Sequence, residues 1–573
     1  MNSQDAVIQW IGGPVLHARA RAEFRIGEAI EVGARRLPGE VIRLDRDMFV
    51  AQVYEDTTGL RPGDPVAGTG RQLSVSLGPH LLGRIFDGLL RPLDAPAAAD
   101  EWEFAPSVAP GDAIVGGAAF GAIPGAGVRQ VCLVPPHLSG EIEQVAPAGR
   151  YGLDATLCTI RTGDGAREEI GFSQIWPVRI PRPVKERLPA DEPMVTGQRI
   201  LDALFPVARG GRAALPGGFG TGKTVLQETL AKWCDADVIV YVGCGERGNE
   251  MAEVLHEFPD LADPRTGRRL MERTIIIANT SNMPVAAREA SIYTGVTIGE
   301  YFRDQGLNVA LMADSTSRWA EALREVSGRL GELPGESGYP AYLGARLGEF
   351  YERAARVRTL ADGAGSLTII GAVSPPAGDF SEPVTSHTKR YVGCFWGLDR
   401  DRAQARFYPA IHPLLSYSEA ADRFAPWWSR NGNTAWREQR ETLLTLLERQ
   451  ADLERMARIV GKDALPPGQQ LTLICAELVN EGFLRQSAFS ENDRYCSPAR
   501  QSAMLRLILR FVELAERALA AGATPQAIAD LPVLRRLQRM GEEIGEDDMA
   551  GFEALRTTLD SAMAQLGAAS NAA

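Results

Sequence analysis

The chain has 573 residues, enough for about three to five domains that each bury a core of their own. Hydrophobic residues make up 45% of it and charged residues 23%, which is ordinary for a globular protein in water. A formal net charge of −12 argues against a general nucleic-acid-binding protein, and no run of about eighteen apolar residues is present to span a bilayer.

The seven cysteines and six histidines are scattered along the chain, with no Cys-x-x-Cys pair. Their spacing fits neither a zinc site nor a disulfide framework, so reduced thiols are expected. The N-terminus, Met1–Asp5, lacks the basic and apolar regions of a signal peptide. We therefore expect a cytoplasmic location, with any attachment to a membrane made through a partner.

Residues 1–75 predict a small β-barrel. Short apolar stretches without a helical period follow one another closely and are broken by Gly and Pro turns. The expected strands are Ala6–Ile11, Ala29–Val32, Glu40–Leu44 and Met48–Tyr54. A connector over residues 76–109 is expected to lead onward from the barrel.

A second strand-rich stretch covers residues 110–183 and carries no group of residues that suggests chemistry. It is expected to be a structural or docking insertion. Its last part, Trp176–Pro183, is rich in proline, which removes backbone donors and restricts neighbouring residues. This part predicts an extended linker at a domain boundary rather than a helix or a strand.

Between residues 184 and 418, short apolar runs alternate with stretches of helical length. The runs are Val238–Val242, Thr274–Ala278, Asn308–Ala313 and Ser366–Val373. Nearly continuous apolar runs are typical of parallel strands that are buried on both faces. The alternation predicts a parallel βα-repeating sheet within a multidomain α/β protein, with ligands at the carboxyl ends of the strands.

The most specific short motif is a P-loop. It reads Gly217-Gly218-Phe219-Gly220-Thr221-Gly222-Lys223-Thr224. Glycines let backbone N–H groups turn onto phosphate oxygens, and the helix that follows directs its partly positive N-terminus at the same anion. Lys223 is expected to bind the β- and γ-phosphates, and the Thr224 hydroxyl is expected to bind Mg²⁺.

Two acidic residues follow apolar runs. Asp314 ends one run and is expected to hold Mg²⁺ through water. Another run leads into a glycine-flanked segment that carries Glu246 and Arg247. Glu246 is expected to orient and polarise the water that attacks the γ-phosphorus, with Arg247 stabilising charge or holding Glu246 in place. The alternative is a glutamate that interacts with a helix dipole, beside a solvated arginine.

Residues 419–573 predict a helical domain. Leucines at helical spacing begin at Leu443 and stop before Gly461, and a second apolar helix stops before Gly522. The pair Thr524-Pro525 then predicts a helix start, with Thr as the N-cap and Pro as the first helical residue. The leucine stripes are more typical of a core than of a partner surface.

Longer motifs cover most of the chain. They are Pro216–Val225, Tyr241–Met251, Asn279–Arg303, Leu311–Leu330, Gly371–Thr385 and Phe395–Ser418. In them the chain resembles the catalytic A subunits of the V/A-type rotary ATPases, in a form similar to the prokaryotic ones. The resemblance implies an N-terminal β-barrel, a RecA-like nucleotide-binding domain and a C-terminal helical domain. It also implies that the β-rich insertion distinguishes these catalytic chains from the F-type subunits and from the B subunits, which lack it.

The same resemblance implies roles for single residues. The segment Gly217–Val225 binds the nucleotide, and Asp314 is the Walker-B carboxylate that serves Mg²⁺. Glu246 is the general base or water-orienting residue. Arg247 and Arg318 are active-site arginines.

Two aromatic residues match the positions where the family packs adenine. They are Tyr408 and Phe489, which would stack on the base, although both also suit an ordinary core. The chain departs from the family at Gly218, where Pro is usual, and at Thr221, where many eukaryotic members have Cys. Residues 408–413 also differ from the common pattern, which puts the details of adenine packing in doubt.

The resemblance implies ATP or ADP with Mg²⁺, in a ring where three copies alternate with three B subunits. One of the B subunits would supply a trans arginine. Further implied partners are central-stalk and peripheral-stalk subunits and, indirectly, a membrane sector that moves H⁺ or Na⁺; nucleic acid is not among them. The chain would then lie on the cytoplasmic face of the membrane through these partners. The sequence gives neither the coupled ion nor the direction of the reaction.

Two other functions stay open at this point. One is a non-catalytic, nucleotide-binding ring subunit, which the set of Lys223, Glu246 and Asp314 argues against. The other is a RecA-type motor of another kind, such as an RNA translocase or an export ATPase. The acidic composition and the insertion oppose that second alternative.

Overall fold

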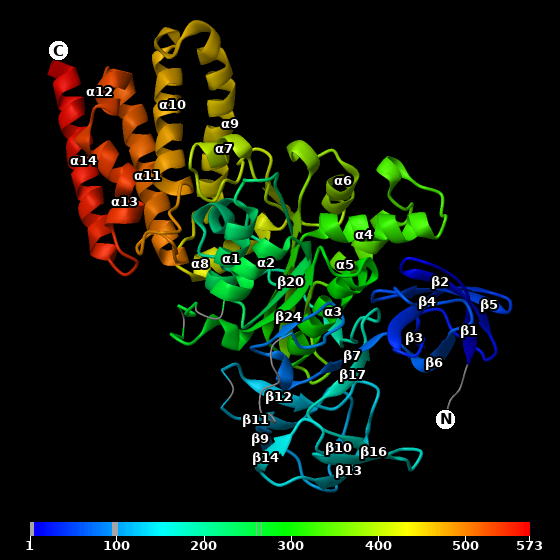
Figure 1. The fold of residues 1–573 in the computed structure, drawn as a ribbon. Helices are drawn as coiled ribbons and strands as arrows, with labels where there is room; N and C mark the ends of the chain where they lie inside the picture. Colours follow the sequence, from blue (N-terminus) through cyan, green and yellow to red (C-terminus); the bar gives the residue numbers. More distant parts are fainter. Residues whose placement is uncertain (1–4, 94–100, 126, 259–260, 265, 573) are drawn as a thin grey trace. The chain divides into compact units, whose positions relative to one another are not determined.

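The computed structural model describes residues 5–93, 101–125, 127–258, 261–264 and 266–572. The chain forms two compact units, which Figure 1 colours along the sequence. The first unit comprises Met1–Pro189, Gly210–Arg212 and Ala236–Val392, and the second comprises Ala190–Arg209, Ala213–Asp235 and Gly393–Ala573. The first four residues and residues 94–100 of the expected connector lie outside the described ranges, and the expected domain boundaries stay predictions.

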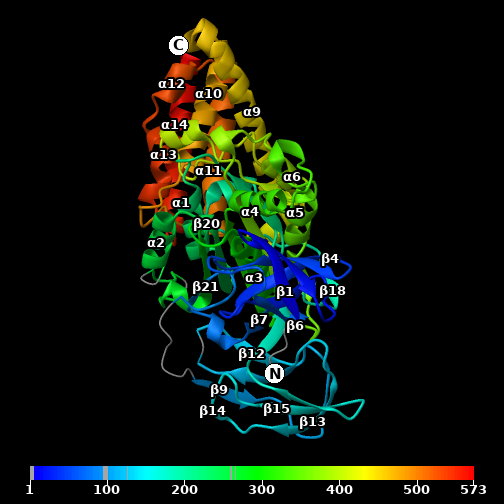
Figure 2. The ribbon, with the colours of Figure 1, turned by 45° about the vertical axis from the view of Figure 1, so that its right-hand side comes forward.

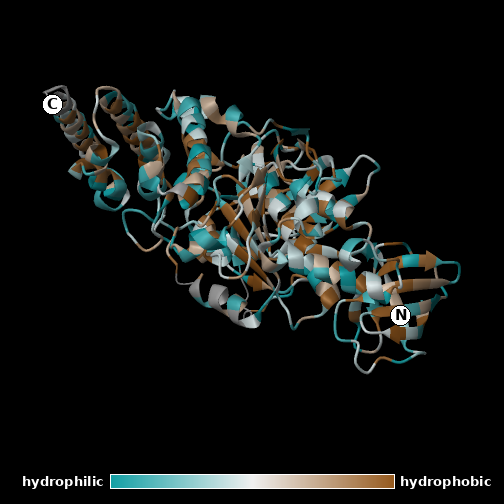
Figure 3. Cartoon of the chain, turned by 90° about the horizontal axis from the view of Figure 1, so that it is seen from above, coloured by the Kyte–Doolittle hydropathy of each residue, from teal (hydrophilic) through white to brown (hydrophobic). Residues whose placement is uncertain are grey.

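The first unit begins with a closed six-stranded barrel, as expected. Its strands, in the spatial order β1-β2-β5-β4-β3-β6, are β1 (Ala6–Gly12), β2 (Val15–Ala20), β5 (Met48–Val53), β4 (Leu37–Asp45), β3 (Glu28–Val32) and β6 (Pro65–Gln72). Alternate residues such as Ile8, Leu16 and Val41 point inward and are fully buried. The strands near the N-terminus are accordingly largely brown in Figure 3. The sequence pattern missed β2 and β6, which are mixed with polar residues and glycine.

The insertion consists of two four-stranded sheets, both visible in Figure 2. One sheet contains β10 (Ala113–Ile114), β13 (Gly140–Val145), β15 (Cys158–Thr162) and β16 (Arg167–Ile170). The other contains β12 (Gln130–Leu133), β11 (Ala119–Ile123), β9 (Glu101–Pro106) and β14 (Gly149–Gly152). Phe104, Phe120 and Ile160 are fully buried in one apolar cluster, so the insertion has a core of its own.

The expected linker at Trp176–Pro183 is partly wrong, because its first two residues belong to a strand. Strand β17 (Gln174–Pro177) pairs with β7 (Ser74–Leu77) in a two-stranded antiparallel sheet. A proline at the end of an edge strand costs no ladder hydrogen bond, which is why the prolines did not exclude pairing. Beyond the strand, Arg182 is buried, donates from Nε to Asp304 Oδ2 at 2.6 Å, and lies over the ring of Trp176 at 4.9 Å.

Arg179, in the same segment, joins two buried carboxylates of the first unit. Its guanidinium donates to both oxygens of Glu40 in β4, at 2.8 Å each. It also donates to both oxygens of Glu289 in α3 (Val285–Asp304), at 3.1 and 2.7 Å. Burial opposes the charge of Arg179, but Glu289 and Glu40 outweigh burial and raise the pKa of Arg179. The barrel and α3 are thereby fixed to one segment that has no regular structure of its own.

The parallel sheet of the first unit confirms the four expected strands. Its order is β24 (Ala364–Val373), β22 (Asn308–Asp314), β20 (Val238–Glu246), β21 (Thr274–Thr280) and the short β8 (Ile85–Phe86), all parallel to their neighbours. All nine residues of β20 are buried, as its apolar sequence predicted. Helix α3 packs against β20, β21, β22 and β24 (Figure 1), and α4 (Thr316–Arg329) packs against α3.

The remaining elements of the first unit lie around this sheet. They are α2 (Gly248–Glu257), α5 (Leu343–Tyr351), α6 (Pro383–Lys389), β18 (Glu186–Arg187) and β23 (Ala355–Arg358). Strand β23 pairs antiparallel with both β24 and β18. No helix in the described ranges is long and apolar enough to cross a membrane.

The second unit combines a small sheet with a set of helices. Strand β19 (Arg212–Pro216) is parallel to β25 (Cys394–Phe395), which is antiparallel to β26 (Tyr417–Ser418). The helices are α1 (Lys223–Trp233), α7 (Arg400–Gln404), α8 (Ala425–Arg430), α9 (Trp436–Val460), α10 (Pro467–Val479), α11 (Pro498–Ala520), α12 (Pro525–Ala529), α13 (Pro532–Glu543) and α14 (Met549–Ala572). The α9 and α11 ends fall where Gly461 and Gly522 predicted them, and the Thr524 side chain caps α12 as expected.

Asp202 organises the segment before β19. It is 4% exposed and accepts hydrogen bonds from the Thr196 N–H and hydroxyl, the Gly197 N–H and the Gln501 side chain, at 2.6 to 2.9 Å. Burial raises the pKa of Asp202 to about 6, although these hydrogen bonds act in the opposite direction. The Asp202 carboxylate therefore has four hydrogen-bond donors, and its burial still makes the charged form unfavourable in free energy.

The seven cysteines all lie in the described ranges, are all buried, and form no disulfide. Burial raises the pKa of Cys158 to about 11 and those of Cys132 and Cys475 to about 12. These three thiols are therefore protonated, and all seven cysteine side chains are shielded from solvent.

Replacing Arg179 by Leu is expected to destabilise the barrel and α3 by about 3–5 kcal/mol, because Glu40 and Glu289 would stay buried without a counter-charge. Hydrogen exchange of amides in β4 and α3 measures the loss. The control is Arg329→Leu, which breaks the exposed Arg329–Glu325 pair of the same unit and should cost about 0–1 kcal/mol. If the amides of β4 and α3 exchange at the same rate in both variants, Arg179 does not stabilise the contact between the barrel and α3.

The titration of Asp202 predicts a pH dependence. Its folded pKa of about 6 lies above the ordinary value of 3.8, so the stability that it contributes is present below pH 3.8 and lost as the pH rises through 6. The free energy of unfolding of the wild type should fall, relative to Asp202→Asn, by about 3 kcal/mol from about pH 4 to about pH 7. Urea unfolding across this range measures it, with Asp530→Asn at the end of α12 as the control. If the difference in unfolding free energy between the wild type and Asp202→Asn stays constant with pH, the titration of Asp202 does not contribute.

Candidate nucleotide-binding and catalytic site

The P-loop of the second unit joins β19 to α1. Gly220 and Gly222 have φ values of 77° and 82°, a region that residues with a Cβ rarely adopt. A Cβ on Gly217 would lie 2.5 Å from the Thr221 hydroxyl. That hydroxyl donates to the Gly218 carbonyl at 2.8 Å, so Thr221 closes the loop internally. The glycines and Thr221 thus set the course of the loop, and Lys223 and Thr224 begin the helix that follows it.

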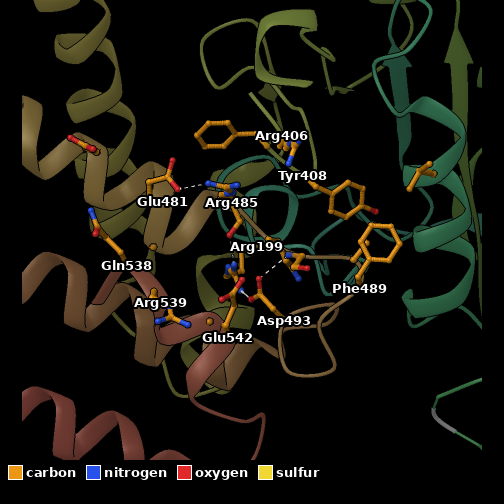
Figure 4. Close-up of a pocket in the computed structure, with 18 residues that line it drawn as sticks. Arg199, Arg406, Tyr408, Glu481, Arg485, Phe489, Asp493, Gln538, Arg539 and Glu542 are labelled. Carbon is orange, nitrogen blue, oxygen red and sulfur yellow. Dashed lines mark hydrogen bonds and ion pairs between the residues drawn. The ribbon is translucent and has the colours of Figure 1, made fainter. Parts of the chain in front are cut away.

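The second unit also contains a cavity of about 870 Å³ beside the first turn of α1. Val225, Tyr408 and Phe489 all line it, and Figure 4 shows the two aromatic rings near each other on one side. The Tyr408 hydroxyl donates to the Thr229 hydroxyl of α1, and burial raises the pKa of Tyr408. Phe489 is 97% exposed. An aromatic ring left in water at the wall of a cavity beside a P-loop is suited to stacking on a base.

In the first unit, two acidic residues end neighbouring strands. Parallel pairing places Gly243 of β20 opposite Asp314 of β22, and Glu246 ends β20 beyond Gly243. Asp314 is 2% exposed and accepts from the Tyr241 hydroxyl at 3.5 Å, while Glu246 is 8% exposed. The two carboxylates therefore lie at the same edge of the sheet, as the strand pattern predicted.

The end of β20 is held by contacts with α3 and the segment before it. Gly245 has a φ of 73°, and a Cβ there would lie 2.7 Å from Arg288. The Ser281 N–H donates to the Glu246 carbonyl at 2.8 Å, and Arg288 Nη2 donates to the Ser281 carbonyl at 3.2 Å. Arg288 was not singled out in the sequence because nothing local marks it; its place becomes clear only when β20 and α3 are packed together.

The two expected active-site arginines differ in their surroundings. Arg318, in the first turn of α4, donates to Glu321 at 2.9 Å. That hydrogen bond outweighs burial and raises the pKa of Arg318, and the charges of Glu246 and Glu250 act in the same direction. Arg318 therefore feels the charges of Glu246, at the end of β20, and of Glu250, in α2. The Arg247 side chain is 58% exposed, 4.0 Å from Glu250.

Each unit offers one oxygen donor that the sequence predicts for Mg²⁺. Thr224 offers a hydroxyl and Asp314 a carboxylate, which are the oxygen ligands that Mg²⁺ prefers. Across the described residues no cluster of three or more His, Cys, Asp or Glu side chains could hold a metal by itself.

Four family models match the chain. The ATP synthase alpha/beta family, nucleotide-binding domain, matches residues 197–418, and its beta-barrel domain matches residues 8–70. The ATP synthase alpha/beta subunit barrel-sandwich domain matches residues 93–179. The C-terminal domain of V and A type ATP synthase matches residues 425–528.

Curated relatives match over nearly the full length. The A subunit of the A-type ATP synthase of Thermococcus sp. (strain KI) is 52% identical over 550 residues, covering 92% of this chain and 94% of the relative. The corresponding chain of Methanopyrus kandleri is 50% identical and covers 99% of both chains. The V-type ATP synthase alpha chain of Halothermothrix orenii is 49% identical and covers 96% of this chain and 97% of the relative.

Among solved structures, the assembled ATPase EscN of the type III secretion system of enteropathogenic E. coli has a TM-score of 0.65. It covers 88% of this chain and 100% of its own, at 23% identity, and so supports the fold alone. The relatives near 50% identity carry the assignment. The chain belongs to the ATP synthase alpha/beta family, among the A subunits of the A- and V-type ATP synthases.

Proposed function

We propose that the chain is the catalytic subunit of a rotary ATPase, which hydrolyses or synthesises ATP and is coupled to ion movement across a membrane. The observation that carries this proposal is the pair Glu246 and Asp314, buried at the ends of neighbouring strands in a chain that also has an intact P-loop. A non-catalytic ring subunit would not need this pair. A motor acting on RNA or on exported protein is not supported, since the relatives near 50% identity are ATP synthase subunits.

The P-loop binds the phosphates in this proposal. Its backbone N–H groups and the N-terminus of α1 face the anion, and Lys223 adds a positive charge at the β- and γ-phosphates. Thr224 and Asp314 would hold Mg²⁺, Asp314 through water, and the bound ion would supply positive charge at the phosphate oxygens. Gly218 in place of proline leaves the loop less restricted before the nucleotide binds.

Glu246 orients and polarises the attacking water in hydrolysis. Its low exposure and its position at a strand end fix the carboxylate, which is what a positioned base requires. Arg318 and Arg247 supply positive charge close to this carboxylate, where negative charge develops on the phosphoryl group. The adenine base stacks on Phe489 and Tyr408, with Val225 lining the same cavity.

Assembly with other subunits follows from membership of the family, and we propose its details. Three copies alternate with three B subunits, which supply a trans arginine that contributes about 10³–10⁵ in rate. Stalk subunits connect this ring to a membrane sector that moves H⁺ or Na⁺, so the chain lies on the cytoplasmic face through its partners. The acidic composition fits the absence of nucleic acid from this set.

Replacing Glu246 by Gln tests the assignment of the base. The variant keeps the shape of the side chain, so Mg-ATP binding should change by less than about threefold, while phosphate release in the ring assembled with B subunits should fall by about 10²-fold or more. Glu325→Gln, on the exposed part of α4, is the control and should keep wild-type turnover. Near-normal hydrolysis by the Glu246 variant would remove Glu246 from this role.

Gly245→Ala tests whether the backbone positions Glu246. The added Cβ would meet Arg288 and require a positive φ, so turnover should fall by about tenfold or more with little loss of ATP affinity. Gly248→Ala, at the start of α2, is a matched control, because a Cβ there meets nothing within 4 Å and its φ is ordinary. If both variants keep full turnover in the assembled ring, the conformation at Gly245 does not control the reaction.

A further inference from the structure

The loop that carries Phe489 has no helix or strand to fix it. The irregular segment between the π-helical turn Asn480–Leu484 and α11 covers residues 485–497, and this loop is its part 485–493. Phe489 itself makes almost no contact, since it is 97% exposed. The position of its ring therefore depends on how the backbone of this loop is held.

One buried side chain, Arg199, holds both ends of the loop. Arg199 is 1% exposed and precedes the π-helical turn Ile200–Leu204. Its Nε donates to the Phe483 carbonyl and its Nη2 to the Arg485 carbonyl, both at 2.6 Å. Its Nη1 forms an ion pair with Asp493, and Asp493 in turn accepts from the Ser487 N–H at 2.8 Å. The guanidinium thus contacts the loop at Arg485 and again at Asp493, and Figure 4 labels the three residues.

Gln486 extends this connection to the second aromatic residue. Its side-chain oxygen accepts from the Arg199 N–H at 3.0 Å, and its side-chain nitrogen donates to the Gly197 carbonyl at 2.9 Å. Its own backbone N–H donates to the Tyr408 carbonyl at 2.7 Å. Tyr408 and Phe489 line the same cavity, so both of its aromatic residues are tied to the backbone around Arg199.

The geometry requires arginine in particular. The planar guanidinium reaches two carbonyls and a carboxylate in three directions, which a lysine ammonium on a flexible stem cannot reproduce at the same distances. A buried carbonyl that loses its donor must recover one from water, so the loop would relax toward solvent and carry Phe489 with it.

We propose that Arg199 is a positioning residue for the adenine half of the nucleotide site, acting through the loop Arg485–Asp493. It does not touch the phosphates in this proposal, and its effect is confined to the base. The inference rests on the proposed function, because it takes the cavity beside α1 to be the adenine site.

The test compares two ligands on the full-length chain. Mg-ATP has the base, whereas magnesium tripolyphosphate has only the phosphates. In Arg199→Lys the affinity for Mg-ATP, measured by titration calorimetry, should fall about tenfold or more, while the affinity for tripolyphosphate should stay within about twofold. Asp493→Asn removes the charge of the ion pair and leaves one side-chain oxygen for the two donors, Arg199 and the Ser487 N–H. It should shift the same ratio in the same direction by a smaller factor, which covers the case of a poorly folded Arg199 variant.

Arg353→Lys is the matched control for general loss of stability. Arg353, in the first unit, is 4% exposed and also donates to a carbonyl and a carboxylate, those of Val178 and Glu300, at 2.6 Å each. It does not line the cavity described above. Its replacement should lower the melting temperature but leave the ratio of the two affinities unchanged.

Each outcome decides one claim. A changed ratio in the Arg199 and Asp493 variants alone supports the positioning role. An unchanged ratio, or an equal change in Arg353→Lys, overturns that role and leaves the proposed function intact. A wild-type chain that binds neither ligand overturns the proposed function itself.

Discussion

A buried guanidinium must find acceptors for its N–H donors, and this requirement fixes the parts of the chain that have no secondary structure. In the first unit, Arg179 and Arg182 bring an irregular, proline-rich segment onto carboxylates of the barrel and α3. In the second unit, Arg199 does the same for an irregular loop, using carbonyls as well as a carboxylate. Such charges are expensive to bury, so each is held only while its whole set of partners is in place. Order in these segments is therefore cooperative.

The parallel strands impose a second constraint, which decides where acidic residues can lie in the sheet. A strand buried on both faces has no room for a charge along its length, so acidic residues collect where it leaves the sheet. Glu246 and Asp314 stand at such ends, and parallel pairing puts them at one edge. The carboxylates lie at the rim of the sheet there, while the sheet holds their backbone. Gly245 then turns the last residue of β20 away from the strand direction.

What could be predicted from the sequence followed from local rules. Apolar runs gave the strands of the parallel sheet, glycines gave the ends of α9 and α11, and Thr524 gave the cap of α12. The P-loop and the two acidic strand ends were visible because their residue types are tied to fixed local spacing. Arg199 was not visible, since its partner carbonyl at Phe483 is 284 residues away and any residue type could have supplied it. The pairing of β17 with β7 was missed for the same reason, because a distant strand decided it. The helical spacing that begins at Leu443 also took in Met456, whose side chain is exposed on α9.

The buried cysteines can report local opening of the structure without an added label. Because a protonated, buried sulfhydryl reacts with an alkylating reagent only after the surrounding structure opens, each cysteine records the opening frequency of its neighbourhood. Cys132 and Cys158 lie in the insertion, Cys244 in the central strand β20, and Cys475 and Cys496 near α10 and α11. Mass spectrometry of partly alkylated protein, with and without nucleotide, would rank these regions by the ease with which each one opens. No label would have to be engineered into the chain.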